Sequence, residues 1–139
     1  MLARKGQCAC GEIKYSVTGE PMHTVFCYCK DCQRLTSTDK WFGAFFAKDN
    51  FQLTAGSPKI YSRTSDAGNI VNALFCGNCA TTIAGELPAI NFYSVAVATL
   101  LDAGDMQPSI VLYAASAPSW AVFPEGVPSF DAMPPRSDS

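Results

Sequence analysis

Apolar and polar residues alternate along much of the chain with a period of two, which is typical of half-buried β-strands. Over residues 13–18, Ile13, Tyr15 and Val17 alternate with polar neighbours. Further alternating, aromatic or β-branched segments predict strands at 22–26, 41–46, 51–53, 59–63, 70–75, 81–85, 91–98 and 110–114. Turn-forming residues separate these segments, and we expect Ser65–Asn69 to connect two of them as a hairpin.

One short segment, Lys30–Thr36, has the pattern of a helix. Closely spaced strands with so little helix predict a mainly β fold, and 139 residues are the size of a single domain. Prolines recur from Ala117 onwards, so this part of the chain is expected to wrap irregularly over the surface. Residues 132–139 are expected to form a loose tail after a domain that spans residues 5–131.

Charge and hydropathy restrict the partners. Ten basic and twelve acidic residues give a net charge of −2, and no basic run is present, so we expect no nucleic-acid partner. The apolar runs are too short to span a bilayer, and residues 1–6 are not followed by the apolar stretch of a signal peptide. We therefore expect a cytoplasmic protein that makes no use of a membrane.

All seven cysteines fall into three tight clusters, which are Cys8-Ala9-Cys10, Cys27-Tyr28-Cys29-Lys30-Asp31-Cys32 and Cys76-Gly77-Asn78-Cys79. The odd number disfavours a disulfide framework, and a reducing compartment keeps thiols free to bind metal. The spacing therefore favours zinc, with disulfides or buried free thiols as the alternative.

The seven thiols divide into a set of four and a set of three. A structural zinc takes four ligands, whereas a catalytic zinc takes three protein ligands and one water or substrate. The two outer pairs can supply a closed structural site that joins distant parts of the chain, through Cys8, Cys10, Cys76 and Cys79. The middle triplet can supply a catalytic site, through Cys27, Cys29 and Cys32. The rival assignment, the triplet plus one distant cysteine, would leave three thiols without a metal.

The spacing also makes a prediction about the backbone. Sulfurs on one zinc lie under ~4 Å apart, whereas residues i and i+2 of a flat strand are ~6.7 Å apart. The two C-x-C pairs therefore need bent backbone, for which Gly6 and Gly11 bracket the first pair. Gly77 and Asn78 are the residues that a tight turn between Cys76 and Cys79 requires.

The cysteine motifs resemble those of the glutathione-dependent formaldehyde-activating enzyme (GFA) family. The segments that carry the resemblance are Gly6–Gly11, Cys27–Arg34, Phe75–Cys79, Val95–Leu101, Ser119-Trp120 and Val127–Asp131. The resemblance implies a CENP-V/GFA-type domain with a β-tent fold of several coiled antiparallel sheets. It also implies a structural zinc on the outer four cysteines and a catalytic zinc on the triplet. The family's activity joins glutathione and formaldehyde into S-(hydroxymethyl)glutathione, a carbon–sulfur lyase reaction in reverse.

Two positions depart from the family pattern. Tyr28 stands where the family commonly has histidine, and Leu35–Thr38 lacks the usual Ser-Gly pair. Metal binding survives both changes, whereas the substrate need not be formaldehyde. A bulkier carbonyl compound or another glutathione conjugate is the alternative.

Other polar and aromatic residues are weaker candidates. We expect His23 to be an ordinary strand residue and not a catalytic base. The charged residues of the predicted helix either meet the carboxylates of glutathione or form a solvated face; they are Lys30, Asp31 and Arg34. The aromatic residues of the 41–46 segment are expected in the core more than in a substrate wall; they are Trp41, Phe42, Phe45 and Phe46.

The sequence thus predicts an enzyme with two zinc ions that acts on glutathione or a glutathione adduct, alone or as a homo-oligomer. A zinc-stabilised binding module without catalysis and a redox protein that uses its C-x-x-C pairs are the competing hypotheses. A zinc deaminase is disfavoured because the H-x-E motif that accompanies P-C-x-x-C is missing.

Overall fold

Residues 2–134 are described by a computed structural model, in which ten strands and one α-helix are found. The strands are β1 (Ala3–Gln7), β2 (Lys14–Thr18), β3 (His23–Cys27), β4 (Trp41–Ala47), β5 (Phe51–Ala55), β6 (Lys59–Thr64), β7 (Ile70–Phe75), β8 (Thr82–Leu87), β9 (Phe92–Ala96) and β10 (Ile110–Leu112). The helix is α1 (Lys30–Thr36), and short 3-10 turns are η1 (Lys48–Asn50), η2 (Pro88–Ile90), η3 (Val97–Thr99) and η4 (Ala114–Ser116). The predicted mainly β fold is confirmed.

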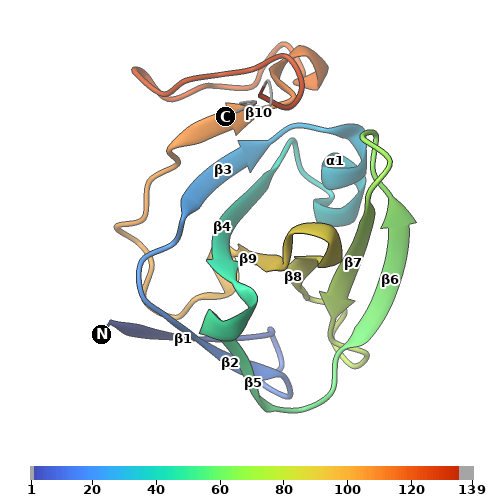
Figure 1. The fold of residues 1–139 in the computed structure, drawn as a ribbon, viewed down its shortest axis with the longest axis vertical. Helices are drawn as coiled ribbons and strands as arrows, with labels where there is room; N and C mark the ends of the chain where they lie inside the picture. The colour runs from blue at the N-terminus through green and yellow to red at the C-terminus, as the bar shows by residue number, and fades with distance from the viewer. Residues whose placement is uncertain (1, 135–139) are drawn as a thin grey trace.

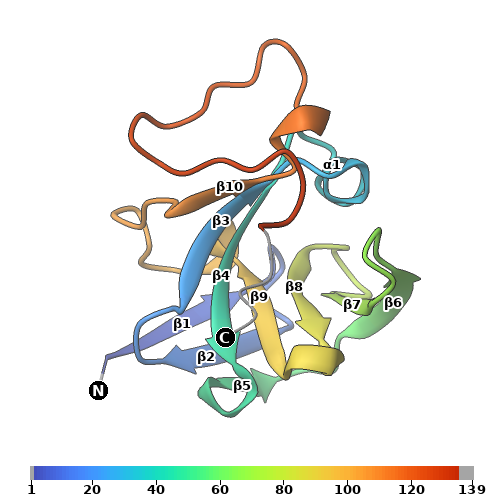
Figure 2. The same cartoon turned by 45° about the horizontal axis from the view of Figure 1, so that its top comes forward.

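The strands form two sheets (Figures 1 and 2). A three-stranded sheet has the order β1-β2-β5, and a seven-stranded sheet has the order β10-β3-β4-β9-β8-β7-β6. The short strand β10 pairs with β3 in parallel, whereas the neighbours of β4 on both sides are antiparallel to it. Figure 1 shows the large sheet curving around, so that α1 lies beside the turn between β6 and β7. This curvature brings elements from distant parts of the sequence around one concave face.

Each strand that the periodicity predicts is present, and α1 has the predicted bounds. The predicted hairpin turn at Ser65–Asn69 is also confirmed, since it joins β6 to β7 and is closed by Ser65 N–H donating to Asn69 C=O at 2.7 Å. Strand β9 ends earlier than predicted because residues 97–99 turn into η3.

Strand β1 was not predicted, because its sequence has no alternation of apolar residues. Its backbone pairs with β2 in an antiparallel register that sets Gly6 opposite Tyr15. A Cβ at Gly6 would collide with the Tyr15 ring, so Gly6 is needed here for close approach and not for bending. Gly11, by contrast, has a φ of 79°, as the predicted bend after the first cysteine pair requires.

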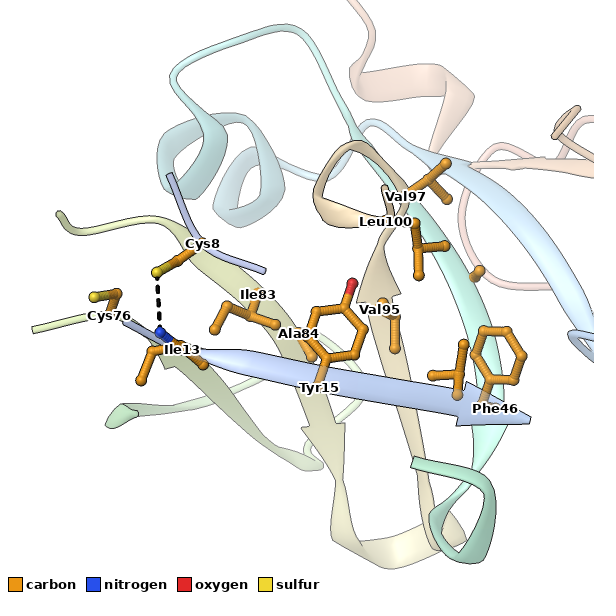
Figure 3. Packing of buried hydrophobic residues seen from close by; sticks show 12 residues of the cluster. Cys8, Ile13, Tyr15, Phe46, Cys76, Ile83, Ala84, Val95, Val97 and Leu100 are labelled. Atoms are coloured by element: carbon orange, nitrogen blue, oxygen red, sulfur yellow. Dashed lines mark hydrogen bonds between the residues drawn. The ribbon is translucent and has the colours of Figure 1, made fainter. Parts of the chain in front are cut away.

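The hydrophobic core lies between the two sheets (Figure 3). From the small sheet it takes Tyr15 and Val17, and from the large sheet it takes Phe46 and Val95. Figure 3 shows Cys8 and Cys76 at one end of this row of side chains, so one cysteine cluster closes an end of the core. This core does not fill the concave face of the large sheet.

Because the Tyr15 ring is buried, we expect the unfolding free energy to fall at alkaline pH. The Tyr15 hydroxyl lies 2.6 Å from Thr99 Oγ1, and burial raises the pKa of Tyr15 to about 12, although the hydrogen bond with Thr99 acts in the opposite direction. The unfolded chain ionises near pH 10, so this contribution to stability is complete below pH 10 and is lost as the pH rises towards 12. Relative to Tyr15→Phe, the native chain should lose about 2–3 kcal/mol of unfolding free energy between pH 10 and 12. Denaturant titrations of both proteins would measure this, and parallel pH profiles would contradict it.

The part of the chain after β10 is irregular, as predicted. It runs as a long loop past β10 (Figure 2) and returns to the sheet through Val111 N–H donating to Pro128 C=O and Phe130 N–H donating to Val111 C=O, both at 2.9 Å. Of the predicted tail 132–139, residues 135–139 lie outside the described part of the chain. Within residues 2–134, no helix is long and apolar enough to cross a bilayer.

Candidate metal centres and active-site cavity

The four outer cysteines converge as predicted. Their sulfur atoms all lie within 4.8 Å of one another. The Cys10 sulfur is 3.7 Å from that of Cys8 and 3.8 Å from that of Cys76. A tetrahedron with zinc–sulfur bonds of ~2.3 Å has edges of ~3.8 Å, so this donor set fits a zinc ion.

Two backbone turns position these four sulfurs. In the first, Ile13 N–H donates to the Cys8 sulfur at 3.2 Å, and Cys8 N–H donates to Ile13 C=O at 3.1 Å. In the second, Asn78 N–H donates to the Cys76 sulfur at 3.4 Å, and Cys76 N–H donates to a carbonyl five residues on, that of Thr81, at 3.0 Å. Backbone N–H groups that point at sulfur stabilise its thiolate form, which is the form that binds metal.

The surroundings favour the thiolate at Cys79 and Cys8 but not at Cys76, where a hydrogen bond from the Cys79 backbone lowers the pKa but burial and the neighbouring thiols outweigh it and raise the pKa to about 11. The Thr81 hydroxyl and the Thr81 backbone lower the pKa of Cys79 to about 5. Burial raises the pKa of Cys8, but the Ile13 N–H and the thiols of Cys10 and Cys76 together lower it below its usual value. Cys8 and Cys76 are buried, so the cluster is closed towards the core.

The triplet also converges, at the junction of β3 and α1. Cys27 ends β3, Cys29 is the N-cap of α1, and Cys32 lies in its first turn. Their sulfurs lie within 4.8 Å of one another, and those of Cys29 and Cys32 are only 2.8 Å apart. That pair is closer than the ~3.8 Å between two sulfurs on one zinc, but three converging thiols remain a donor set that suits zinc.

The triplet sulfurs are electrostatically unequal. The Cys29 sulfur accepts a hydrogen bond from Cys32 N–H at 3.2 Å. Interactions with the thiols of Cys27 and Cys32 lower the pKa of Cys29 to about 3, and the charge of Arg63 acts in the same direction. The interaction with Cys29 raises the pKa of Cys27 to about 12. The interactions with Cys27 and Cys29 raise the pKa of Cys32 as well. Among the three thiols, Cys29 is therefore the one whose thiolate form the surroundings favour.

Arg63 is a functional candidate that the sequence did not reveal. It projects from β6, and its Nη1 lies 3.2 Å from a carboxylate oxygen of Asp31 on α1. The Arg63 side chain is only 16% exposed, and its Nε finds no hydrogen-bond partner among residues 2–134. A guanidinium in this position offsets part of the negative charge of three nearby thiolates.

A cavity of about 220 Å³ lies against the triplet, on the concave face of the large sheet. It is lined by the three cysteines and by residues from β3, β4, β6, β7, β8, β9 and α1, with the β6–β7 turn, Tyr113 and Met133 also contributing. Most of these side chains are apolar, and the charged ones are Asp31, Arg63 and Asp66. The four outer cysteines do not line this cavity.

The structure divides the predicted aromatic residues of β4 between two faces. Side chains alternate along a strand, so Phe42 and Phe46 face the core, whereas Trp41 and Phe45 line the cavity. The prediction that all four belong to the core is wrong for Trp41 and Phe45. Trp41 is fixed by its indole N–H, which donates to Ser94 Oγ at 2.9 Å.

The remaining candidates are also placed. His23 begins β3 on the surface as an ordinary strand residue, in agreement with the prediction. Of the charged residues on α1, Asp31 lines the cavity, whereas Lys30 and Arg34 are exposed and are not part of its lining. The side chain of Tyr28 is fully buried against Phe123, with 5.1 Å between ring centroids, and it does not line the cavity either. Position 28 therefore contributes no side chain to the cavity wall.

The chain is thus a mainly β domain with two candidate zinc sites, one of four cysteines at the end of the core and one of three cysteines facing a cavity. Comparison with known proteins agrees, since the sequence profile of the family described as glutathione-dependent formaldehyde-activating enzyme (GFA) matches residues 3–116. The chain belongs to the GFA family.

A comparison with solved structures adds the fold alone. A crystal structure of a Rhodobacter sphaeroides protein, a Northeast Structural Genomics target, is similar with a TM-score of 0.56 and 20% sequence identity, over 70% of this chain and 88% of that one. No curated protein sequence matches the chain.

Proposed function

We propose that this protein is a zinc-dependent enzyme of the carbon–sulfur lyase type that acts on glutathione or a glutathione adduct, as S-(hydroxymethyl)glutathione synthase does. One observation carries the proposal: the three cysteines of the triplet face a cavity, whereas none of the four outer cysteines lines it, and two of them, Cys8 and Cys76, are buried in the core. A catalytic zinc needs access for substrate and a structural zinc does not. The family name supports the same substrate.

The proposal gives the two clusters different tasks. The structural zinc is assigned to Cys8, Cys10, Cys76 and Cys79, and the catalytic zinc to Cys27, Cys29 and Cys32. A zinc ion on the triplet would supply a site at which a substrate thiol is held deprotonated near neutral pH.

The chemistry requires no oxidant or reductant. In the synthetic direction, the thiol sulfur bonds to the carbonyl carbon, the C=O double bond becomes single, and the thiol proton ends on the carbonyl oxygen. Lysis is the reverse. Two of the chain's own groups act beside the reactants: Arg63 balances charge near the sulfurs, and Trp41, at the triplet end of the cavity, helps to exclude water from the reacting atoms.

The test is direct turnover. Zinc-loaded protein should accelerate the exchange between glutathione, formaldehyde and their adduct, which NMR follows at equilibrium through the hydroxymethyl protons. Other glutathione conjugates should be tried in parallel, because a lyase for a different conjugate is the first alternative. No acceleration with any thiol adduct, by protein that holds two zinc ions, would favour the second alternative, a non-catalytic zinc-stabilised binding module.

The proposed partners are small molecules alone. The activity needs neither a membrane nor a nucleic acid, and we place it in the cytoplasm, where thiols stay reduced. A homo-oligomer is compatible with the proposal.

Mild chelation should remove the two zinc ions in order. The triplet offers only three protein ligands and is open to the cavity, whereas the outer site offers four, two of which are buried in the core. A brief exposure to EDTA should reduce the zinc content from two ions per chain to one, as measured by elemental analysis. Cys29→Ser, which lacks a triplet ligand, is the control and should hold one ion before and after. A single zinc in freshly reduced and reconstituted native protein would contradict the two-site assignment.

A further inference from the structure

We infer that the cavity beside the triplet accepts an apolar group of about six carbons, borne on the carbon atom that bonds to sulfur. The substrate class is then a thiol adduct of a hydrophobic aldehyde, and not the adduct of formaldehyde alone. This inference rests on the proposed function and specifies its substrate.

The cavity extends well beyond the sulfurs. Cys27 pairs with Trp41 across the β3–β4 ladder, so the triplet lies at the Trp41 end of β4. Phe45 also lines the cavity but is four residues farther along β4, which is ~13 Å at the rise of an extended strand. Formaldehyde contributes only one carbon, and that carbon bonds to sulfur. The cavity wall between Trp41 and Phe45 would then have no contact with the aldehyde part of the substrate.

The far part of the cavity is apolar. Phe45, Leu87 and Ile90 line it, and Val71 lies opposite Arg63 across the β6–β7 ladder, where the charged lining residues of α1, β6 and the β6–β7 turn begin. Arg63 is already paired with Asp31. Burying a polar or charged substituent against hydrocarbon walls is unfavourable unless it finds hydrogen bonds, so these walls select an apolar one.

The size is also sufficient. An apolar protein cavity of about 150 Å³ is known to bind benzene, and this cavity has a volume of about 220 Å³. Each methylene that enters it should improve binding by about fourfold, until the far wall is reached. The glutathione peptide, with its carboxylates, would lie outside the apolar part.

Binding is tested first without catalysis. The chain has two tryptophans, and Trp120 is 69% exposed, so Trp120→Phe leaves Trp41 as the one tryptophan and as a reporter in the cavity wall. Benzyl alcohol, which cannot form a thiol adduct, should change the Trp41 fluorescence with saturation. Glycerol, a polar alcohol, should not do so at the same concentrations.

A variant that fills the cavity localises the effect. Gly85 lines the cavity, and a Cβ there would meet only Val71, at an ordinary 3.6 Å, so Gly85→Val adds methyl groups to the cavity without a backbone clash. This variant should weaken benzyl alcohol binding at least tenfold. Gly104→Val is the matched control, because a Cβ at Gly104 meets nothing within 4 Å, and it should bind as the native chain does. Val71→Phe fills the same space from β7 and replaces Gly85→Val if that variant does not fold.

Turnover completes the test. With glutathione and the series formaldehyde, butanal and heptanal, kcat/KM should rise with chain length in the native chain and in Gly104→Val, and the rise should flatten in Gly85→Val. Equal kcat/KM along the series, or no benzyl alcohol binding, would overturn the inference while activity on the formaldehyde adduct still supports the proposed function. Benzyl alcohol binding that Gly85→Val weakens, without turnover of any adduct, would support the apolar cavity and count against the proposed lyase.

Discussion

Cys29→Ser is expected to abolish turnover while the chain stays folded. A hydroxyl is a poor zinc ligand at neutral pH, so the triplet loses one of its three donors. The fold should survive because Cys29 is the N-cap of α1, where its sulfur accepts a hydrogen bond from Cys32 N–H. Serine is among the preferred N-cap residues and can replace this interaction.

Activity should fall by more than the ~10–100-fold that the loss of an outer-shell partner typically causes at a metal site. The measurement is turnover of the glutathione adduct together with a thermal melt of the same sample. Retained activity in Cys29→Ser would mean that the triplet is not the reactive site, and an unfolded variant would mean that the triplet is the structural one.

Cys76→Ser is expected to have the opposite effect, a large loss of stability. Cys76 is buried in the end of the core, and its sulfur lies 3.8 Å from that of Cys10, which is 66 residues away in the chain. A zinc ion bound by both Cys10 and Cys76 would close a loop of 66 residues. The chain-entropy estimate for such a cross-link is about 4 kcal/mol, a large part of the 5–15 kcal/mol by which domains are usually stable.

A loss of that size should lower the melting temperature of Cys76→Ser by about 10 °C or more. Calorimetry of native protein, Cys76→Ser and Cys29→Ser would measure it, and each variant is the other's control because the chemical change is the same. Equal melting temperatures for Cys76→Ser and native protein, with the zinc content unchanged, would show that the outer cluster holds no structural zinc.

Local patterns predicted most of the secondary structure and both cysteine clusters. Alternation of side chains identified the buried strands because one face of each must pack on the core. Cys27, Cys29 and Cys32 could be grouped from spacing alone, since six residues of chain cannot hold them far apart. The outer two pairs could be matched because four is the number of ligands that a structural zinc requires.

The cavity could not be predicted, because curvature of the large sheet assembles it from many separate segments. Arg63 was missed for this reason: it lies in β6, and only the folded sheet brings it to Asp31 and the triplet. Trp41 and Phe45 were assigned to the core because an aromatic run indicates burial but not which of two faces each residue occupies. Strand β1 was missed because backbone pairing with β2, rather than apolar side chains, holds it in place.

The most direct test of the account is thiol binding at the triplet metal. Protein in which cobalt replaces both zinc ions would be titrated with glutathione while the sulfur-to-cobalt charge-transfer absorption is recorded. The absorption should increase until one glutathione is bound per chain, and the increase should be absent in Cys29→Ser, which keeps the outer cluster intact. No change with glutathione or any small thiol, in native protein that holds two cobalt ions, would contradict the assignment of the triplet as a thiol-binding catalytic site.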